Sequence, residues 1–345
     1  MAFSLKHIVP LFITAAVSLS ACSLVDEDLS ECETDYNLNY QLRLVTNMKA
    51  ELQTQLTMET EVNVANALRD YLSGIFTDYA KDVDLGFYDV IEDSTILHKE
   101  SHIMDASQSS YTLFIPVRQY MHVALANVAQ DVNLSLEQED CCHTARVSQT
   151  VRDTVPSHSS GLFAARLPMN IKEGEDQQFD VHLFMANCAT ALVVDTLGSG
   201  IKDLKVYMSG FATGFNLCDS LYRFDYTPIV KSDRIALEDP GMICYANVTF
   251  PSRCVEDTKV VIDTDDPGIG EGADHSLWQI RVYSELKDGS LTETILGVTY
   301  PITAGNLKII KAKAFDNGSV KPGDPSIGVS VTIDWEPATQ HEIIL

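Results

Sequence analysis

The chain has 345 residues, of which 45% are hydrophobic and 21% charged, so it can fill ordinary cores and has room for two domains of usual size. Its 49 acidic residues outnumber its 24 basic ones, which gives a formal net charge of −25. This charge repels phosphate backbones and anionic lipid. It therefore excludes nucleic acid as a partner, and it excludes adsorption flat onto an anionic membrane.

The N-terminus has the three regions of a secretory signal. Lys6 precedes an apolar run over residues 8–17, which is too short to span a bilayer, and small residues follow the run. Residues 19–22, Leu-Ser-Ala-Cys, resemble the lipobox of bacterial lipoproteins, in which the signal is cut before the cysteine and the cysteine thiol is acylated. We predict a signal peptide over residues 1–21 and lipid attachment at Cys22. A plain secretory signal is the alternative, and either signal exports the chain.

Residues 22–37 are interpreted as an acidic tether. Within it, residues 23–28 (Ser-Leu-Val-Asp-Glu-Asp) resemble the short tether that directs lipoproteins of Bacteroidetes-type bacteria to the cell surface, although a solvated linker has the same composition. Acyl chains contribute about 0.8 kcal/mol per buried methylene, so several chains hold a protein on a membrane without a transmembrane helix. The expected localisation is the cell outer membrane, with the chain lipid-anchored and exposed at the surface.

The cysteines point to no metal centre. With Cys22 assigned to lipid, seven of the eight remain, and an odd number in an exported chain leaves at least one thiol free or intermolecular. The tight cluster Cys141-Cys142-His143 lacks the second ligand pair that a zinc site needs. The disulfide pairing of the remaining cysteines stays open.

The first half of the mature chain reads as strands around one helix. Residues 40–46 alternate as a strand does, and from residue 61 the period changes to three and four residues, with Val64, Leu68 and Leu72 on one face. This predicts an amphipathic helix that ends within residues 74–78. Strand patterns then cover residues 83–90, 96–103, 111–116 and 120–128. The polar stretch 131–160 has no sustained period and is interpreted as a long loop with an embedded short strand or turn.

Strand patterns resume near residue 163 and dominate the rest of the chain. They cover residues 179–185, 189–195, 204–209, 242–250, 259–263, 277–284, 291–298, 307–315 and 328–335. Asp288-Gly289 and Asn317-Gly318 stand between strand patterns, and such pairs supply the positive φ angles of tight hairpin turns.

Many short strands with frequent turns predict an all-β fold, mainly antiparallel, rather than a parallel sheet. We expect two β-sandwich domains in tandem, over residues 38–162 and 163–345, with one short crossover helix in the first.

Several segments together resemble the fimbrillin-associated anchor lipoproteins, the FimB-like proteins of Bacteroidetes type V fimbriae. Their order and spacing carry the resemblance, which spans nearly all of the mature chain. The matching features are Cys22, residues 28–32 (Asp-Leu-Ser-Glu-Cys), 42–44 (Leu-Arg-Leu), 85–89 (Leu-Gly-Phe-Tyr-Asp), Pro116 before 120–127, 301–305 (Pro-Ile-Thr-Ala-Gly) and 328–335. Departures are Val117-Arg118-Gln119, where the family tends to carry glycine, and the pair Cys141-Cys142.

The resemblance implies two transthyretin-like β-sandwich domains and no active site or cofactor. Such a protein sits at the base of a fimbria, is held in the outer membrane by acyl chains, and binds the first fimbrillin-like shaft subunit by strand addition. The apolar tail Ile343, Ile344 and Leu345 is the candidate strand, with an ordinary terminal strand as the alternative. The identity of the partner, a basal or a tip position, the domain that carries the interface and O-glycosylation stay open.

Two other classes of function are weighed against this one. Asp263 and Asp265 follow an apolar strand pattern as the acids of a phosphatase do, but that chemistry needs a doubly wound α/β scaffold, and strand patterns follow here instead of a helix. The same acids suggest a calcium loop, but Pro267 interrupts the loop and no glutamate closes it, so a solvated acidic turn is preferred and no metal is expected. The alternative to a fimbrial anchor is a surface lipoprotein that binds glycans through an exposed aromatic side chain such as Trp278 or a pair of tyrosines. An enzyme is not expected.

Overall fold

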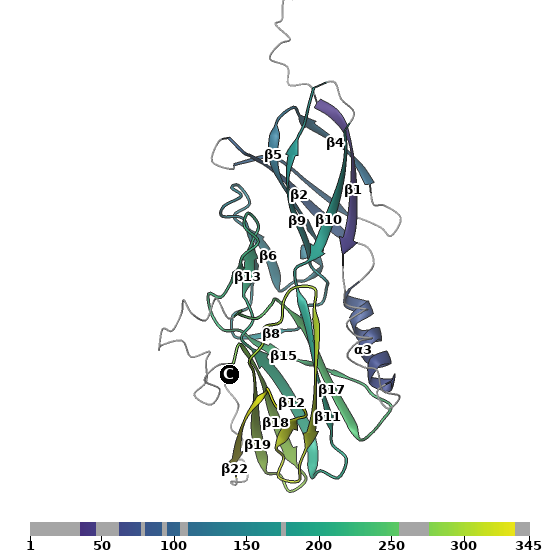
Figure 1. Ribbon diagram of the computed structural model, residues 1–345, viewed down its shortest axis with the longest axis vertical. Coiled ribbons are helices and arrows are strands. Elements are labelled where there is room, and N and C mark those ends of the chain that lie inside the picture. Colours follow the sequence, from purple (N-terminus) through teal and green to yellow (C-terminus); the bar gives the residue numbers. More distant parts are fainter. Residues whose placement is uncertain are drawn as a thin grey trace, which may run out of the picture.

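The computed structural model describes residues 35–45, 62–76, 80–91, 95–103, 110–173, 177–254 and 276–334. The molecule is elongated and built almost entirely of strands (Figure 1), which confirms the predicted all-β fold. A seven-stranded sheet occupies one end, two further sheets pack as a sandwich at the other, and a small fourth sheet lies between them.

The seven-stranded sheet has the strand order β3-β2-β5-β9-β10-β1-β4. Its members are β1 (Asp35–Val45), β2 (Asp82–Asp89), β3 (Ile96–Ile103), β4 (Ser110–Pro116), β5 (Gln119–Ala126), β9 (Phe163–Asn170) and β10 (Gln177–Met185). Neighbours are antiparallel except β1 and β10, which run parallel. Buried side chains from β2 and β5 share one apolar cluster with those of β4 and β10, so the two halves of this sheet face each other across a core.

This sheet includes more of the chain than its sequence pattern predicts. β9 and β10 lie beyond residue 162, where the first domain was expected to end, yet they pair with β5 and β1. The expected boundary between residues 162 and 163 therefore falls inside the first sheet. A strand belongs to the sheet whose strands it pairs with, and the sequence pattern of residues 163–185 does not predict those partners.

The other end of the molecule is a sandwich of two sheets. The five-stranded sheet contains β16 (Asp233–Ile235), β17 (Met242–Thr249), β11 (Cys188–Asp195), β20 (Leu307–Ala314) and β21 (Val320–Pro322). The six-stranded sheet contains β22 (Gly328–Asp334), β19 (Leu291–Val298), β18 (Trp278–Leu286), β12 (Ile201–Ser209), β15 (Ile229–Lys231) and β8 (Thr154–Pro156). The core between them includes Leu192, Met208, Trp278 and Ile310.

Both predicted hairpin turns are present, but one joins different strands than expected. Gly289 has φ 88° and closes the turn from β18 to β19, as predicted. Gly318, with φ 77°, closes the turn from β20 to the short β21 rather than to the last strand. β22 crosses instead to the other sheet, where it pairs with β19.

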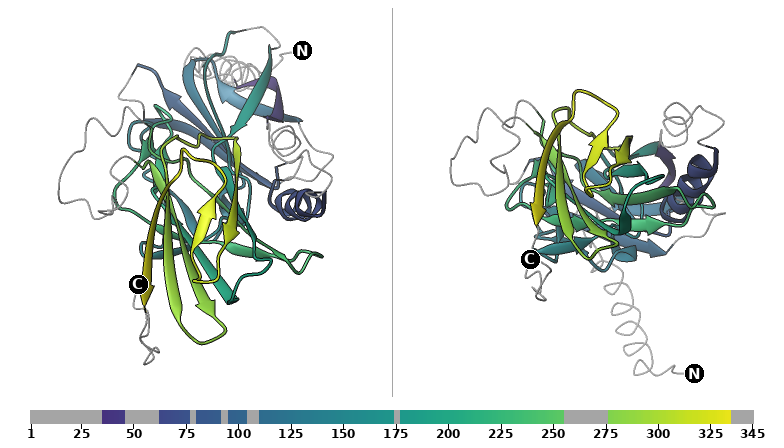
Figure 2. Two further views of the ribbon diagram at one scale, coloured as in Figure 1. Left: turned by 60° about the horizontal axis from the view of Figure 1, so that its bottom comes forward. Right: turned by 90° about the horizontal axis from the view of Figure 1, so that it is seen from below.

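The helix α3 (Val62–Ile75) forms where its apolar period predicts, with Val64, Leu68 and Leu72 buried. Its position differs from the expectation of a crossover helix within the first domain, because it packs against the C-terminal sandwich. Tyr71 donates a hydrogen bond of 2.8 Å to Asp233 on β16. In Figures 1 and 2, α3 lies on the side of that sandwich away from β22. No helix in the described ranges is both long and apolar enough to cross a membrane.

Helix packing explains why β11 is buried along nearly its whole length. Leu192 and Val194 face the six-stranded sheet, whereas Ala191 and Val193 belong to the cluster that contains the buried face of α3. Successive side chains of a strand point to opposite faces, so a strand covered on both faces has a continuous apolar sequence.

The stretch 131–160 contains more regular structure than the predicted loop. It carries β6 (Leu134–Glu137), β7 (Arg146–Gln149) and β8, and it follows a 3₁₀ turn, η4 (Val128–Gln130). β6 and β7 join β13 (Gly214–Asn216) and β14 (Tyr222–Arg223) in the four-stranded sheet. This small sheet forms one wall of both hollows described below.

Candidate functional site

Most residues assigned a role from the sequence lie outside the described residues. They are Cys22, Asp263, Asp265, Ile343, Ile344 and Leu345. Their roles stay predictions. Within the described residues, no group of three or more metal-ligating side chains is brought together.

Trp278 is described, and it is not a surface residue. It is 1% exposed in the core of the C-terminal sandwich. Its indole Nε1–H donates a hydrogen bond of 3.0 Å to the Tyr300 carbonyl, and its ring packs 5.7 Å from that of Phe211. The idea that Trp278 stacks on a sugar is therefore wrong, because the strand that carries it turns this side chain inward.

The first hollow follows from how β9 and β10 meet. They share two residue pairs, Ala164 with Phe184 and Phe163 with Met185, whereas β9 pairs with β5 at eight positions and β10 with β1 at eight. Between those two pairs and the far end, where Gln177 Nε2 donates a hydrogen bond of 3.1 Å to the Asn170 carbonyl, no ladder pair joins β9 to β10. Every second backbone N–H and C=O on each of these two edges points into the gap rather than to a ladder partner.

A groove of about 540 Å³ lies along this seam. Its apolar lining includes Leu167 of β9, Val181 and Phe184 of β10, and Leu217 and Tyr222 from the four-stranded sheet. Phe184 is 58% exposed, a large apolar side chain left to solvent beside two strand edges.

Charged side chains also line this seam groove. Arg166 on β9 and Asp180 and His182 on β10 are all exposed, on the outward faces of their strands. The Tyr222 hydroxyl donates a hydrogen bond of 2.7 Å to the Ala186 carbonyl and so ties β14 to the end of β10. The groove thus combines main-chain hydrogen-bonding edges, apolar side chains and fixed charges.

The second hollow is polar. It has a volume of about 910 Å³ and lies between the four-stranded sheet and the six-stranded sheet. We name it the arginine basin after four of its lining residues, which are Arg146, Arg152, Arg223 and Arg281. Its remaining lining is Glu137, Ser148, Gln149, Asp153, Thr154, Ser209, Thr213, Asp225, Tyr226, Thr227 and Ile229.

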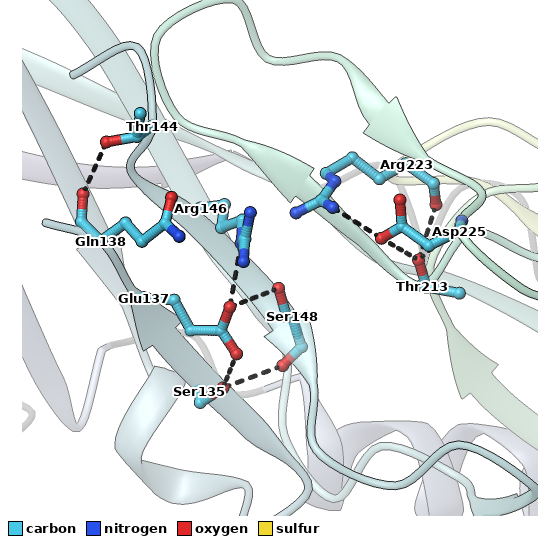
Figure 3. A network of polar contacts seen from close by, with 9 residues as sticks. All are labelled: Ser135, Glu137, Gln138, Thr144, Arg146, Ser148, Thr213, Arg223 and Asp225. Carbon is cyan, nitrogen blue, oxygen red and sulfur yellow. Dashed lines mark hydrogen bonds and ion pairs between the residues drawn. The ribbon is translucent and has the colours of Figure 1, made fainter. Parts of the chain in front are cut away.

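Three of these arginines lie within 4 Å of a carboxylate. Arg281 Nη1 is 3.7 Å from Glu293 Oε1, and Figure 3 shows the other two pairs. Arg146 Nε donates to Glu137 Oε2 at 2.9 Å, and Ser135 and Ser148 donate to the same carboxylate. The hydrogen bond from Arg146 holds the pKa of Glu137 below its usual value.

On the other wall, Arg223 Nη2 lies 2.8 Å from Asp225 Oδ2, and the Thr213 hydroxyl donates to the Arg223 carbonyl at 3.1 Å. The guanidinium groups are therefore positioned before any ligand arrives.

The sequence pattern misses both hollows. Glu137 and Arg146 fall in the stretch interpreted as a loop, and the seam depends on two strands assigned to another domain. The available signal was the alternation over residues 146–149, Arg-Val-Ser-Gln, whose inward and outward side chains match the observed burial of β7.

Comparison with known proteins finds no matching family model and no curated protein that matches. Solved structures with a similar chain course include the fimbrial anchor protein Mfa2 of Porphyromonas gingivalis, 8% identical, with a TM-score of 0.49 over 87% of this chain and 98% of that one. The tip fimbrial protein Mfa3 of the same organism, truncated at its C-terminus, is 11% identical, with a TM-score of 0.43 over 87% of this chain and 100% of that one.

A candidate polysaccharide-binding protein of Bacteroides thetaiotaomicron is 10% identical, with a TM-score of 0.49 over 84% of this chain and 98% of that one. The structural neighbours of this chain thus include fimbrial proteins, as the resemblance in the sequence predicts. Because the identities stay near 10% and the TM-scores below 0.5, the functional argument below is built on the residues of this chain.

Proposed function

We propose that this protein is a non-catalytic surface lipoprotein that attaches a fimbria to the outer membrane and binds a neighbouring fimbrial subunit by strand addition at the seam between β9 and β10. The observation that carries the proposal is that ladder pairing between these two long strands stops after two residue pairs. Two strand edges that face a groove are the feature that strand addition requires, since an added strand gains main-chain hydrogen bonds from an edge and specificity from side-chain pockets.

The dimensions of the seam suit a short strand. Residues 165–170 of β9 lie beyond the paired end, and six extended residues span about 20 Å. Side chains on one face of an incoming strand would meet Leu167 and Val181, which favours apolar residues there. Side chains on its other face would meet Phe184 beside Arg166, Asp180 and His182, which favours charged residues near an apolar one.

Membrane attachment is assigned to the N-terminus of the mature chain. The lipobox cysteine Cys22 becomes the first residue of the mature protein, and acyl chains on it hold the N-terminus at the outer membrane. The partner of the seam is then the first shaft subunit of a fimbrillin type. The apolar tail Ile343, Ile344 and Leu345 remains the candidate for a strand that this protein donates to the partner subunit.

The binding half of the proposal is tested at Phe184. Affinity capture of the tagged full chain, after gentle detergent extraction of cells, is expected to recover a fimbrillin-like β subunit with the wild type, whereas Phe184→Glu should lower recovery at least tenfold. Phe315→Glu is the matched control, because Phe315 is also exposed (40%) but lies just after β20 in the C-terminal sandwich. Equal recovery with Phe184→Glu and wild type would remove the seam from the proposal.

The anchoring half is tested at Cys22. Replacement of Cys22 by Ala should release the protein, together with any captured subunit, from cells into the medium. Retention of the Cys22→Ala chain at the outer membrane would show that another segment anchors it. Wild-type chains that retain no protein partner would contradict the fimbrial role itself.

A further inference from the structure

The arginine basin differs in charge from the rest of the protein. Four arginines and three carboxylates line it, and Glu293 lies 3.7 Å from Arg281 just outside the lining, so the basin is close to neutral on a chain whose formal net charge is −25. A negative group on a ligand would be repelled less in this basin than elsewhere on the molecule.

The arginines keep hydrogen-bond donors to spare. A guanidinium has five N–H donors, and Arg146 uses one of them on Glu137 at 2.9 Å. The side chains of Arg146 and Arg223 are 28% and 24% exposed, and Arg152 is exposed at the rim. Because a guanidinium forms paired bonds with a planar carboxylate, positioned arginines of this kind select carboxylate groups.

The basin also contains acceptors that require donors. The side chains of Glu137 and Asp225 are 39% and 50% exposed, so their carboxylate oxygens are open to a ligand. The carboxylates of Glu137 and Asp225 retain further lone pairs that face the hollow. A simple inorganic anion offers nothing to these acceptors, whereas hydroxyl groups donate to all of them.

The remaining lining argues against a peptide. Ile229 is the only aliphatic side chain of the lining, so the basin offers no apolar pocket for the side chains of a peptide. Hydroxyl groups line it instead, from Ser148, Ser209, Thr213 and Thr227. The ring of Tyr226 is held by a hydrogen bond of 3.0 Å from its hydroxyl to the Val151 carbonyl.

We propose that the arginine basin binds an acidic oligosaccharide, that is, a glycan whose sugar rings carry carboxylate groups. The carboxylates bind Arg152 and Arg223, and the sugar hydroxyls donate to the carboxylates of Glu137 and Asp225. A volume of about 910 Å³ is large for a small-molecule site and admits more than one sugar ring. The proposal is independent of strand addition, because the seam groove lies on β9 and β10 and shares no lining residue with the basin.

The test uses the detergent-solubilised full chain on an array of oligosaccharides that carry uronic or sialic acids, each beside its neutral counterpart. Binding of acidic members at least tenfold tighter than of their neutral counterparts is expected, and it should weaken with added salt because the contacts are ionic. An array without that preference overturns the proposal. Binding of poly-glutamate as tight as that of the best saccharide overturns it as well, because an acidic peptide would then be the ligand.

Two variants tie binding to the basin. Arg152→Ala should lower the affinity for the best acidic oligosaccharide about tenfold or more, while Arg69→Ala, which removes the same charge from the exposed face of α3, should leave it unchanged. Arg223→Lys keeps the positive charge beside Asp225 but removes the planar pair of N–H donors that a carboxylate binds, so it should also weaken binding. Unchanged affinity in both basin variants would place the saccharide elsewhere.

Discussion

The two ends of the molecule differ in how their strand edges are closed. In the C-terminal sandwich, three of the four edge strands, β8, β16 and β21, contain three residues each. In the N-terminal sheet, β9 and β10 contain eight and nine residues and meet at two pairs. Short edges resist pairing with another chain, and long open edges invite it. Under the proposed function, the open edges of β9 and β10 serve recognition, whereas the C-terminal sandwich contributes mainly to stability.

The largest effect is expected in the closed sandwich. Trp278→Ala removes a side chain that is 1% exposed and breaks its hydrogen bond to the Tyr300 carbonyl. The free energy of unfolding should fall by about 3–5 kcal/mol, as for other large-to-small changes in cores. Denaturant unfolding followed by fluorescence and circular dichroism measures this. A loss below about 1 kcal/mol would mean that this core is less tightly packed than the structure shows.

The next effect concerns pH and lies in the N-terminal sheet. His122 on β5 is buried and stacks on Phe87 at 4.3 Å, and burial lowers its pKa from 6.5 to about 4. Between those values the unfolded chain binds a proton that the folded chain does not. The contribution is therefore fully present above pH 6.5 and is lost as the pH falls toward 4, by about 3 kcal/mol.

The control for this pH effect is His122→Phe, which keeps an aromatic ring beside Phe87 without a titrating group. Unfolding free energies of both chains between pH 4 and 7 should show a shallower slope for the variant. Identical slopes would show that His122 titrates normally.

A smaller effect is expected where the four-stranded sheet separates the two hollows. A Cβ at Gly214 on β13 would lie 2.1 Å from the Val147 carbonyl oxygen of β7, so Gly214→Ala must push these strands apart. A loss of about 1–3 kcal/mol is expected, as for other overpacked sites. Gly74→Ala on α3 is the matched control, because nothing lies within 4 Å of its added Cβ and alanine favours a helix, so a slight gain is expected.

The smallest effect on stability is expected at the seam, and it tests most directly whether the seam differs from the closed sandwich. Phe184→Ala at the seam removes a ring that is 58% exposed, so the free energy of unfolding should stay within about 0.5 kcal/mol of wild type. Capture of the fimbrial subunit should nevertheless decrease. A large loss of stability would show that the seam is a packed core rather than a recognition surface.

Much of the local structure was predictable because local physics decides it. The period of Val64, Leu68 and Leu72 predicts α3, which the structure places at Val62–Ile75. Alternation predicts β2, β5 and β18 to within a few residues. The segment 131–160 was missed because strands of three or four residues carry too few alternations to register as a pattern.

The candidate sites also divide into one that local sequence predicts and two that it does not. The segment that resembles a lipobox is contiguous, so lipid attachment at Cys22 can be predicted from sequence alone. The seam and the basin are assembled from segments far apart in the chain, such as Arg146 and Arg281 around one hollow. No spacing along the sequence relates such residues to one another.

The sequence by itself determined the all-β class, the helix and the Gly289 turn, because backbone sterics and side-chain periodicity act over a few residues. The export signal stays a prediction of the same local kind. Only the tertiary structure decided that β9 and β10 complete the first sheet, that α3 covers the second sandwich, and that Trp278 points inward. These outcomes depend on which distant strands pair and which faces become covered. Strand pairing and the covering of faces are decided by the burial of apolar surface over the whole chain, and a pattern of a few residues does not predict them.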